Sequence, residues 1–307
     1  MVKLGYLVPT REQIMQGEHS TRGLLDRGRF ARDQGFDSLW VGDSLFARPR
    51  HDPLSLLAGM ATAIPDVELG TAILLSSLRN PVLLAQQLAT IDQLSEGRLR
   101  VGVGIGANAP PIHAEFSAAG VPFEKRVGRL VESINLCRAL WTGQPVSWQG
   151  RWLLDQVIVA PSPYTAGGPP IWYASSVDVG VARAAQYFDG WFPIGPDAQT
   201  VKRQHGILRK EAGRFDRALP TTAVYLTVCI DDDADRANQH IDAYLEEYYS
   251  LPPKILRSVQ ACFGGTAGAM ANWLREFLDA GADHLVLRIV GDYKKSLVEL
   301  SRIRADL

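Results

Sequence analysis

The stretch from Glu68 to Gly106 constrains the fold more than any other part of the chain. It contains an apolar run, a polar loop, an amphipathic segment, a glycine turn and a second apolar run, in ELGTAILLSSLRNPVLLAQQLATIDQLSEGRLRVGVGIG. Apolar runs without alternation are typical of parallel strands that helices cover on both faces. The stretch therefore predicts one complete βαβ unit.

The middle of this unit carries the start and stop signals of a helix. Asn80 is a good N-cap, and Pro81 occupies the first helical position, where a missing N–H costs nothing. Gly97 can adopt the left-handed conformation that ends a helix. Apolar residues at three- and four-residue spacing predict one buried face. They are Leu84, Leu88, Ile91 and Leu94.

The second strand has a face without side chains, because Gly102, Gly104 and Gly106 alternate with apolar residues. Another backbone or a flat ligand can approach such a face closely. The alternative, glycines that only allow tight barrel packing, stays open. A dinucleotide-binding fingerprint is not supported, because Ala107 stands where it needs glycine and no helix opens directly behind the run.

The same alternation of strand and helix continues through the chain. Strands are expected at residues 4–8, 38–42, 68–75, 100–105, 171–174, 190–192, 223–230 and 284–289. With right-handed crossovers they predict an α/β fold, a (β/α)8 TIM barrel that forms a single domain over 1–307. Insertions are expected as long loops at 9–20, 107–121 and 250–265 and as a hairpin turning at Gln149–Gly150.

Composition favours a small organic molecule as the partner. Lys plus Arg (32) nearly equals Asp plus Glu (33), so there is no electrostatic footprint for nucleic acid or an anionic membrane. The three cysteines lack metal-ligand spacing and are typical of reduced thiols. With neither a leader nor a membrane-length apolar run, a cytoplasmic protein is expected.

The C-terminal ends of the strands are where such barrels hold their sites. They show no paired carboxylates, nucleophile elbow or histidine cluster, which argues against hydrolysis and metal chemistry, so no metal site is expected. Ser175 and Ser176 lie between a strand and the N-terminus of a helix. Their hydroxyls and the free N–H groups of the helix end together favour the binding of an anion. Ser176 as a simple helix N-cap is the alternative. The glycine face and this anion site together indicate a flat, phosphorylated cofactor.

Four segments resemble the bacterial-luciferase-like flavin-dependent oxidoreductases, and the resemblance spans nearly the whole chain. They are GFDSLWVGDSLF, the 68–106 stretch, ASSVDVGVARAAQYFDGWFP and GTAGAMANWLREFLDAGADHLVLR. Members of this family are barrels that hold FMN or a deazaflavin coenzyme across the strand ends. The resemblance implies that Ala72 and Ile73 form the bulge behind the flavin ring, often with a non-prolyl cis peptide. It also implies that Gly104 lies near the reactive edge of the ring, that Ser175 and Ser176 bind phosphate, and that Asp43 is an acidic site residue.

The chain departs from the family pattern at two positions. Many relatives have histidine after the acidic residue, but here Ser44 follows Asp43, and a serine does not titrate near pH 7. Either His51 or His113 supplies the proton from a loop, or the chemistry needs none; both histidines also fit surface positions. Luciferase itself has an arginine for the phosphate where Ile105 stands here, so light emission is not expected.

Two further residues are candidates for the cofactor pocket. Tyr6 lies on the first strand, and Asn108 follows the fourth.

The main functional hypothesis is an FMN-dependent monooxygenase that uses reduced flavin and oxygen on a small organic substrate. A flavin reductase is the expected source of reduced flavin, and the resemblance implies a homodimer or higher homo-oligomer. One alternative is a deazaflavin-dependent hydride-transfer enzyme on the same barrel. Another is a flavin-binding protein without catalysis.

Overall fold

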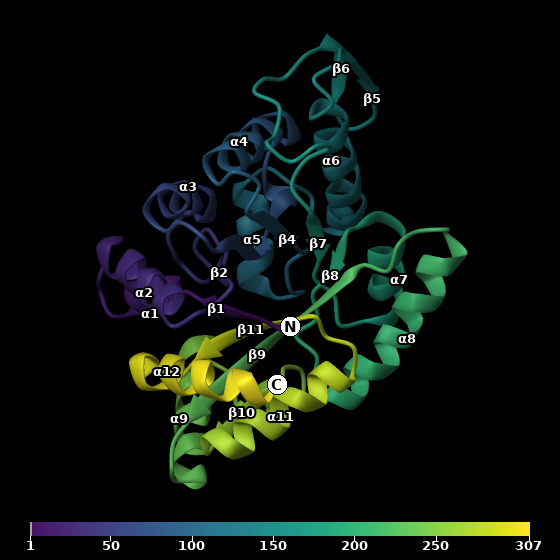
Figure 1. Cartoon of the computed structure of the whole chain (residues 1–307). Coiled ribbons are helices and arrows are strands. Elements are labelled where there is room, and N and C mark those ends of the chain that lie inside the picture. Colours follow the sequence, from purple (N-terminus) through teal and green to yellow (C-terminus); the bar gives the residue numbers. More distant parts are fainter. Residues whose placement is uncertain (1) are drawn as a thin grey trace.

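The structure, a computed structural model, describes residues 2–307 and shows eight parallel strands closed into a barrel (Figure 1). The barrel strands are β1 (Lys3–Leu7), β2 (Ser38–Val41), β3 (Glu68–Leu74), β4 (Leu99–Val103), β7 (Ile171–Tyr173), β8 (Gly190–Trp191), β9 (Thr221–Ile230) and β11 (His284–Ile289). They neighbour one another in this order, and the pairing of β11 with β1 closes the ring. The predicted TIM barrel is confirmed.

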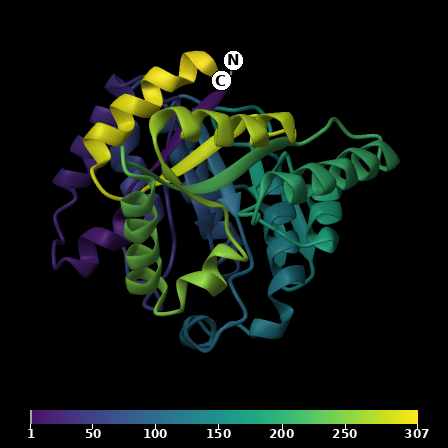
Figure 2. The same ribbon diagram turned by 90° about the horizontal axis from the view of Figure 1, so that it is seen from below.

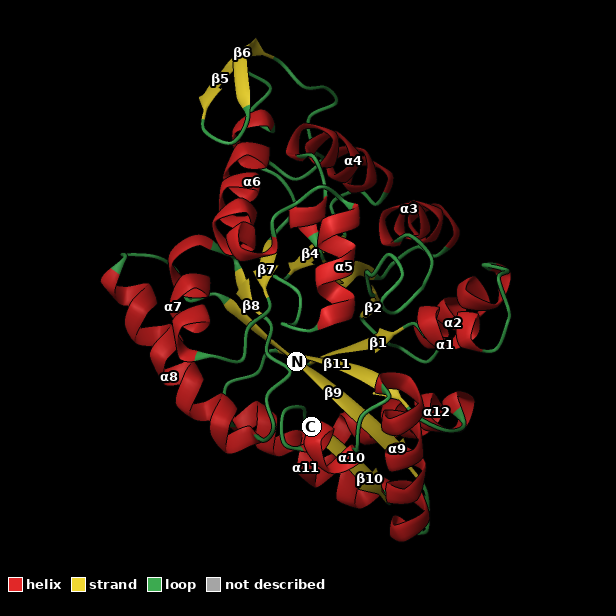
Figure 3. Ribbon diagram, turned by 180° about the vertical axis from the view of Figure 1, so that it is seen from behind, coloured by secondary structure: helices red, strands yellow, loops and turns green. Residues whose placement is uncertain are grey.

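A ring of helices covers the outside of the barrel, as the helices around the strands in Figure 3 show. The main helices are α2 (Arg22–Asp33), α3 (Pro53–Ala63), α4 (Pro81–Leu94), α6 (Arg126–Leu140), α7 (Asp178–Tyr187), α8 (Ala198–Arg214), α9 (Ala234–Tyr249), α11 (Ala267–Asp279) and α12 (Tyr293–Ile303). Short 3-10 turns are η1 (Ser76–Leu78), η2 (Phe123–Lys125) and η3 (Arg304–Asp306). The start signals of α4 act as predicted: Asn80 Oδ1 accepts from the Val82 N–H at 2.9 Å, and Pro81 is the first helical residue.

Three segments that the sequence predicts to be loops contain secondary structure. The helix α1 (Thr10–Met15) follows β1, and α5 (Pro110–Ala118) follows β4. Pro110 and Pro111 favour a loop in the sequence, but both lie in the first turn of α5. Proline is tolerated there because the N–H groups of the first turn have no acceptor within the helix, so the missing N–H of proline costs nothing. The segment 250–265 contains α10 (Pro253–Arg257) and β10 (Cys262–Gly265), and β10 pairs in parallel with the C-terminal half of β9. The β5–β6 hairpin (Val146–Gln149, Leu153–Val157) forms as predicted.

Apolar side chains form one layer inside the barrel and another between the strands and the helices. The inner layer consists of Leu7, Trp40, Trp172, Phe192, Ala223, Tyr225 and Val286. Tyr6 belongs to the outer layer, where its ring meets the edge of Phe36 at 6.5 Å. The prediction that Tyr6 reaches a cofactor in the barrel is therefore wrong: side chains alternate along a strand, and Leu7 takes the inward position.

The two ends of the barrel differ in what they carry. Both termini lie near one another at the N-terminal end, and the helices α5 and α10 gather at the opposite end (Figure 2). Within residues 2–307, no helix combines the length and the apolar character that crossing a membrane requires.

Candidate functional site

The strand β3 is irregular near its C-terminal end. Its register against β4 shifts between Thr71 and Leu74, and the peptide bond Ala72–Ile73 is cis. The bulge and the cis bond that the family resemblance implies are therefore present in this chain. Ala72, Ile73 and Ala174 are partly buried and pack against the inner layer of the barrel.

The glycines of β4 receive this bulge. Thr71 Oγ1 donates to the Gly102 carbonyl at 2.7 Å, and a Cβ on Gly102 would lie 2.2 Å from the Thr71 carbonyl oxygen. A Cβ on Gly104 would lie 2.6 Å from Ile73 Cδ1. The glycine face thus admits the neighbouring strand and its side chain. Ala72, Ile73, Gly104 and Ala174 form what we call the apolar shelf.

Ser175 and Ser176 connect β7 to α7 at the same end of the barrel. The N-cap of α7 is Val177, so the alternative reading of Ser176 as the N-cap is wrong. Ser176 Oγ accepts from the Ile194 N–H at 3.3 Å, and Ser175 Oγ lies 3.4 Å from the Val177 nitrogen. First-turn N–H groups have no acceptor within their helix, so two hydroxyls and a helix N-terminus meet at this point.

Asp178 brings a negative charge to this helix end. Hydrogen bonds from Arg203 and then Gln204 hold the pKa of its carboxyl below the usual value. Arg203 Nη1 lies 2.8 Å from Asp178 Oδ2, so the charge of Asp178 is paired.

Asp43 is engaged in an ion pair with Arg79. Its side chain is 2% exposed; Oδ2 accepts from the Leu75 N–H at 2.9 Å, and Oδ1 from Arg79 Nη2 at 3.2 Å. Arg79 also reaches Asp52. Asp43 therefore joins the end of β2 to the turn after β3.

Ser44 holds a carboxylate that sequence reasoning missed. Its hydroxyl donates to Glu115 Oε1 at 2.6 Å, and the N–H groups of Phe46 and Ala47 donate to the same oxygen at 2.8 and 2.9 Å. Glu115 lies on α5 and is fully buried. Because the contacts join residues about seventy positions apart, no local pattern announces them. Ser44 thus fastens the segment after β2 to α5.

The predicted histidines lie in separate places. His51 Nε2 lies 3.0 Å from the His19 carbonyl oxygen. His113 is exposed on α5, where Nε2 lies 2.8 Å from Asn108 Oδ1 and the ring rests on Phe123 at 4.0 Å between centroids. The structure thus brings His113 and Asn108 together on the surface, while Asp43 is occupied by Arg79.

A second group that the sequence did not reveal lies at the C-terminal ends of β1, β2, β9 and β11. We call it the Arg–Tyr cluster: Arg11, Arg48, Arg50, Arg288, Tyr225, Tyr244, Tyr248 and Tyr249. Its centre is Arg288, which is 6% exposed and donates from Nη1 to the Tyr249 hydroxyl at 2.9 Å. Glu12 accepts a hydrogen bond from the Tyr244 hydroxyl. A sequence hint exists in α9, where Tyr244 and Tyr248 are four residues apart and Tyr249 follows directly.

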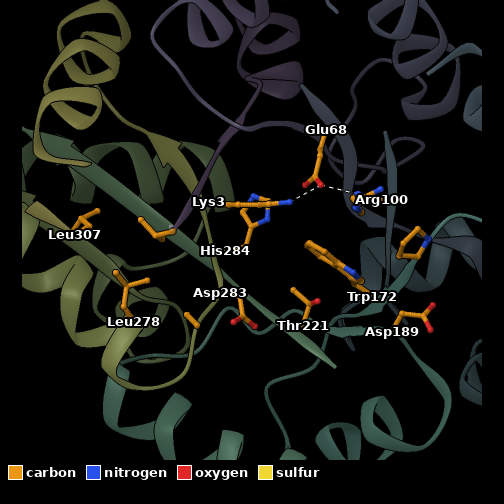
Figure 4. Close-up of a pocket in the computed structure, with 13 residues that line it drawn as sticks. Lys3, Glu68, Arg100, Trp172, Asp189, Thr221, Leu278, Asp283, His284 and Leu307 are labelled. Atoms are coloured by element: carbon orange, nitrogen blue, oxygen red, sulfur yellow. Dashed lines mark hydrogen bonds and ion pairs between the residues drawn. The ribbon is translucent and has the colours of Figure 1, made fainter. Parts of the chain in front are cut away.

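The N-terminal end of the barrel opens a cavity of about 860 Å³ (Figure 4). In it Lys3 and Arg100 both contact Glu68, at 2.8 and 2.7 Å, and His284 lies beside Trp172. Both cations pair with the same carboxylate, and the N-terminal face of such a barrel carries stability rather than catalysis. We therefore place the functional site at the opposite end. Among residues 2–307, no three His, Cys, Asp or Glu side chains group as metal ligands.

The closed barrel carries the apolar shelf and the serine-lined helix end at the same end of its strands, which is where barrels of this kind hold their sites. Residues 2–284 match the family described as luciferase-like monooxygenase. The chain belongs to this family, and it is an oxidoreductase of the luciferase-like type.

Known proteins of two coenzyme types are similar to it. A relative named F420-dependent glucose-6-phosphate dehydrogenase, from Nocardia farcinica, is 26% identical over 310 residues that cover 91% of each chain. A solved F420-dependent secondary alcohol dehydrogenase, in complex with an F420–acetone adduct, superposes with a TM-score of 0.80 at 20% identity over 98% of each chain. The oxygenating constituent of a Pseudomonas putida 3,6-diketocamphane monooxygenase, in complex with FMN, has a TM-score of 0.79 at 18% identity and covers all of this chain and 98% of that one. At such identity the two structures establish the fold alone.

Proposed function

We propose that the protein is an F420-dependent oxidoreductase that transfers a hydride between a small organic substrate and the deazaflavin. The observation that carries the proposal is the similarity over 91% of the chain to a dehydrogenase named for F420. This favours the hydride-transfer alternative over the FMN monooxygenase that the sequence first suggested. The substrate is not carried over from that name, because 26% identity leaves the side chains around a substrate free to differ.

The residues present fit a flat, phosphorylated coenzyme. The apolar shelf offers a surface for a ring system, and Ser175, Ser176 and the N-terminus of α7 offer donors for a phosphate. When bound, the deazaflavin supplies a carbon that accepts or releases the hydride. Ile73 fixes the shelf by packing on Gly104, so the protein orients the ring through apolar contact.

Oxidation of an alcohol also releases the hydroxyl proton, which needs an acceptor. We assign this role to Glu12, on the helix directly after β1, whose carboxylate is held by the Tyr244 hydroxyl. In this assignment Glu12 would accept the O–H proton of the substrate, and the deazaflavin, when bound, would supply the acceptor for the C–H hydride. Glu12 would thus supply the proton acceptor that this site otherwise lacks. Ser44 stands in place of the family's histidine, and Asp43 is paired with Arg79.

The second candidate is the FMN-dependent monooxygenase, supplied by a flavin reductase. It is favoured by the likeness to the FMN-bound oxygenating constituent, which shares the barrel. The third, a flavin-binding protein without catalysis, shares the same binding residues. Coenzyme choice and turnover separate all three.

The test is an anaerobic titration of the purified protein with F420 and, separately, with FMN, followed by coenzyme absorbance and fluorescence. F420 is expected to bind, and to be reduced by a panel of alcohols and sugar phosphates without oxygen. The double variant Ser175→Ala, Ser176→Ala should bind F420 about tenfold more weakly, through loss of hydrogen bonds to a charged group. Ser301→Ala, on the outer helix α12, is the matched control. Binding of FMN alone, with oxygen uptake, would replace this proposal by the monooxygenase. Tight binding without turnover would favour the non-catalytic protein.

A further inference from the structure

The Arg–Tyr cluster holds more positive charge than its surroundings balance. It contains four guanidinium groups, which stay ionised in proteins, and the carboxylate that contacts it is that of Glu12. Burial raises the pKa of the Tyr225 and Tyr244 hydroxyls well above 10, so these phenols are neutral and offset nothing. One carboxylate thus faces four cations.

The arginines are crowded together despite their like charge. Arg11 and Arg288 lie over the ring of Tyr248, with the guanidinium carbons 4.3 and 4.4 Å from its centroid. Arg50 donates to the hydroxyl of the same tyrosine at 3.0 Å. Burial lowers the pKa of Arg11; Tyr248 opposes this shift, and the charges of Arg48 and Arg50 add to it. Packing against aromatic faces offsets part of this repulsion, but a buried charge without a counterion is costly.

The cluster also contains buried hydrogen-bond donors that have no acceptor among the described residues. They are Arg11 Nε, Arg11 Nη1, Arg288 Nε and the Tyr225 hydroxyl. Arg288 and Tyr225 are 6% and 7% exposed, so bulk water does not satisfy them. Native proteins leave few buried polar groups unpaired, and each such group needs an explanation. An oxyanion would accept hydrogen bonds from these guanidinium and phenol donors and would also balance the excess positive charge. The paired N–H groups of an arginine match the geometry of a carboxylate or a phosphate.

The position of the cluster separates it from the serine site. Around the barrel, β8 and β9 lie between β7 and β11 on one side, and β4, β3 and β2 lie between β7 and β1 on the other. The cluster lies at the ends of β9, β11, β1 and β2, so the strand order places it across the barrel mouth from Ser175 and Ser176, which follow β7. A coenzyme phosphate at the serines therefore leaves the cluster to a different anion.

We propose that the Arg–Tyr cluster binds an oxyanionic group of the substrate, a phosphate or a carboxylate, and so restricts the enzyme to anionic substrates. The inference rests on the proposed function in one respect: it takes the bound anion to be part of the molecule that reacts with the coenzyme at the same end of the barrel. Arg11 and Arg288 supply the unpaired donors, and Tyr225 supplies a neutral hydroxyl. Arg48 and Arg50 add charge and orient the tyrosines.

The test measures anion binding without any coenzyme, by calorimetric titration of the protein with inorganic phosphate and with acetate at low ionic strength. Saturable binding of at least one anion is expected. Arg11→Met should weaken it about tenfold or more, because a charge-assisted hydrogen bond is lost. Arg48→Met provides a second variant in case one fails to fold, and circular dichroism checks the fold of each. Arg29→Met removes the same charge from an exposed pair with Asp26 on α2, and should leave binding within about twofold.

Three results would overturn the proposal. The first is the absence of saturable binding of either anion to the folded protein, and the second is equal weakening of binding in Arg29→Met and Arg11→Met. The third is competition between phosphate and F420 that disappears in the Ser175→Ala, Ser176→Ala variant, which would give the anion site to the coenzyme. If F420 fails to bind while phosphate still binds and depends on Arg11, the coenzyme proposal fails and the anion site stands.

Discussion

Asp43 and Arg79 form an ion pair that joins the C-terminal end of β2 to the turn after β3. The Asp43 side chain is 2% exposed and that of Arg79 17%. With the Leu75 N–H also donating to it, the carboxylate accepts three hydrogen bonds from Arg79 and Leu75. Asp43 thus holds the backbone at Leu75, directly after the strand that carries the apolar shelf, and its role is structural.

Asp43→Ala should therefore lower the free energy of unfolding by about 3 kcal/mol, because it leaves Arg79 partly buried without its main partner. Urea unfolding followed by circular dichroism measures this. Asp26→Ala, which removes an exposed pair with Arg29, should cost at most about 1 kcal/mol. Unchanged stability of Asp43→Ala together with lost turnover would instead assign Asp43 to the chemistry.

Ser44→Ala should destabilise the protein by about 2 kcal/mol, because buried Glu115 loses one of its donors. The effect should be absent in a Glu115→Leu background, where the carboxylate is gone, so a double-mutant cycle isolates the pair. If Ser44→Ala costs the same in both backgrounds, the hydrogen bond does not hold the loop.

Glu12→Gln should lower kcat about a hundredfold or more while the dissociation constant of F420 stays within about twofold, because the amide cannot accept the substrate proton. Steady-state kinetics and a coenzyme titration give the two quantities. Glu18→Gln, on the loop after α1, is the matched control. A kcat near that of the unaltered enzyme would remove Glu12 from the proposed mechanism.

Stability should fall when the solution is acidified below about pH 6.5, because of His284. Burial, and then the charge of Lys3, lowers the pKa of His284 from 6.5 to about 3. Between these values the unfolded state binds a proton that the folded state does not, so the stability present above pH 6.5 is lost as pH falls toward 3. From pH 6.5 to 5.5 the loss from this residue is about 1 kcal/mol. Urea unfolding at both values should show it, and His284→Asn should show a correspondingly smaller loss. Identical pH dependence in the two proteins would contradict the assignment.

The barrel and the coenzyme end of the site could be predicted from the chain alone, because their signals are local. The cap at Asn80, the proline at position 81 and the apolar runs each act within a few residues. Ala72 and Ile73 lie near the end of a strand, and Gly104, Ser175 and Ser176 follow strands. A barrel places these strand ends together, so the shared location of the residues followed from the order of the elements. Whether they bind the coenzyme stays a prediction.

The orientation and partners of individual side chains were decided by the tertiary structure. Tyr6 could not be placed by sequence, because β1 is apolar on both faces and alternation does not say which face is inside. Ser44 meets Glu115, and Arg288 meets three tyrosines of α9, only when the barrel has closed. The sequence by itself thus determined the elements and their order through short-range periodicity and capping. Closure of the sheet into a barrel decided which charged and hydroxyl side chains, far apart in the sequence, are buried in contact with one another, because no short-range pattern encodes such contacts.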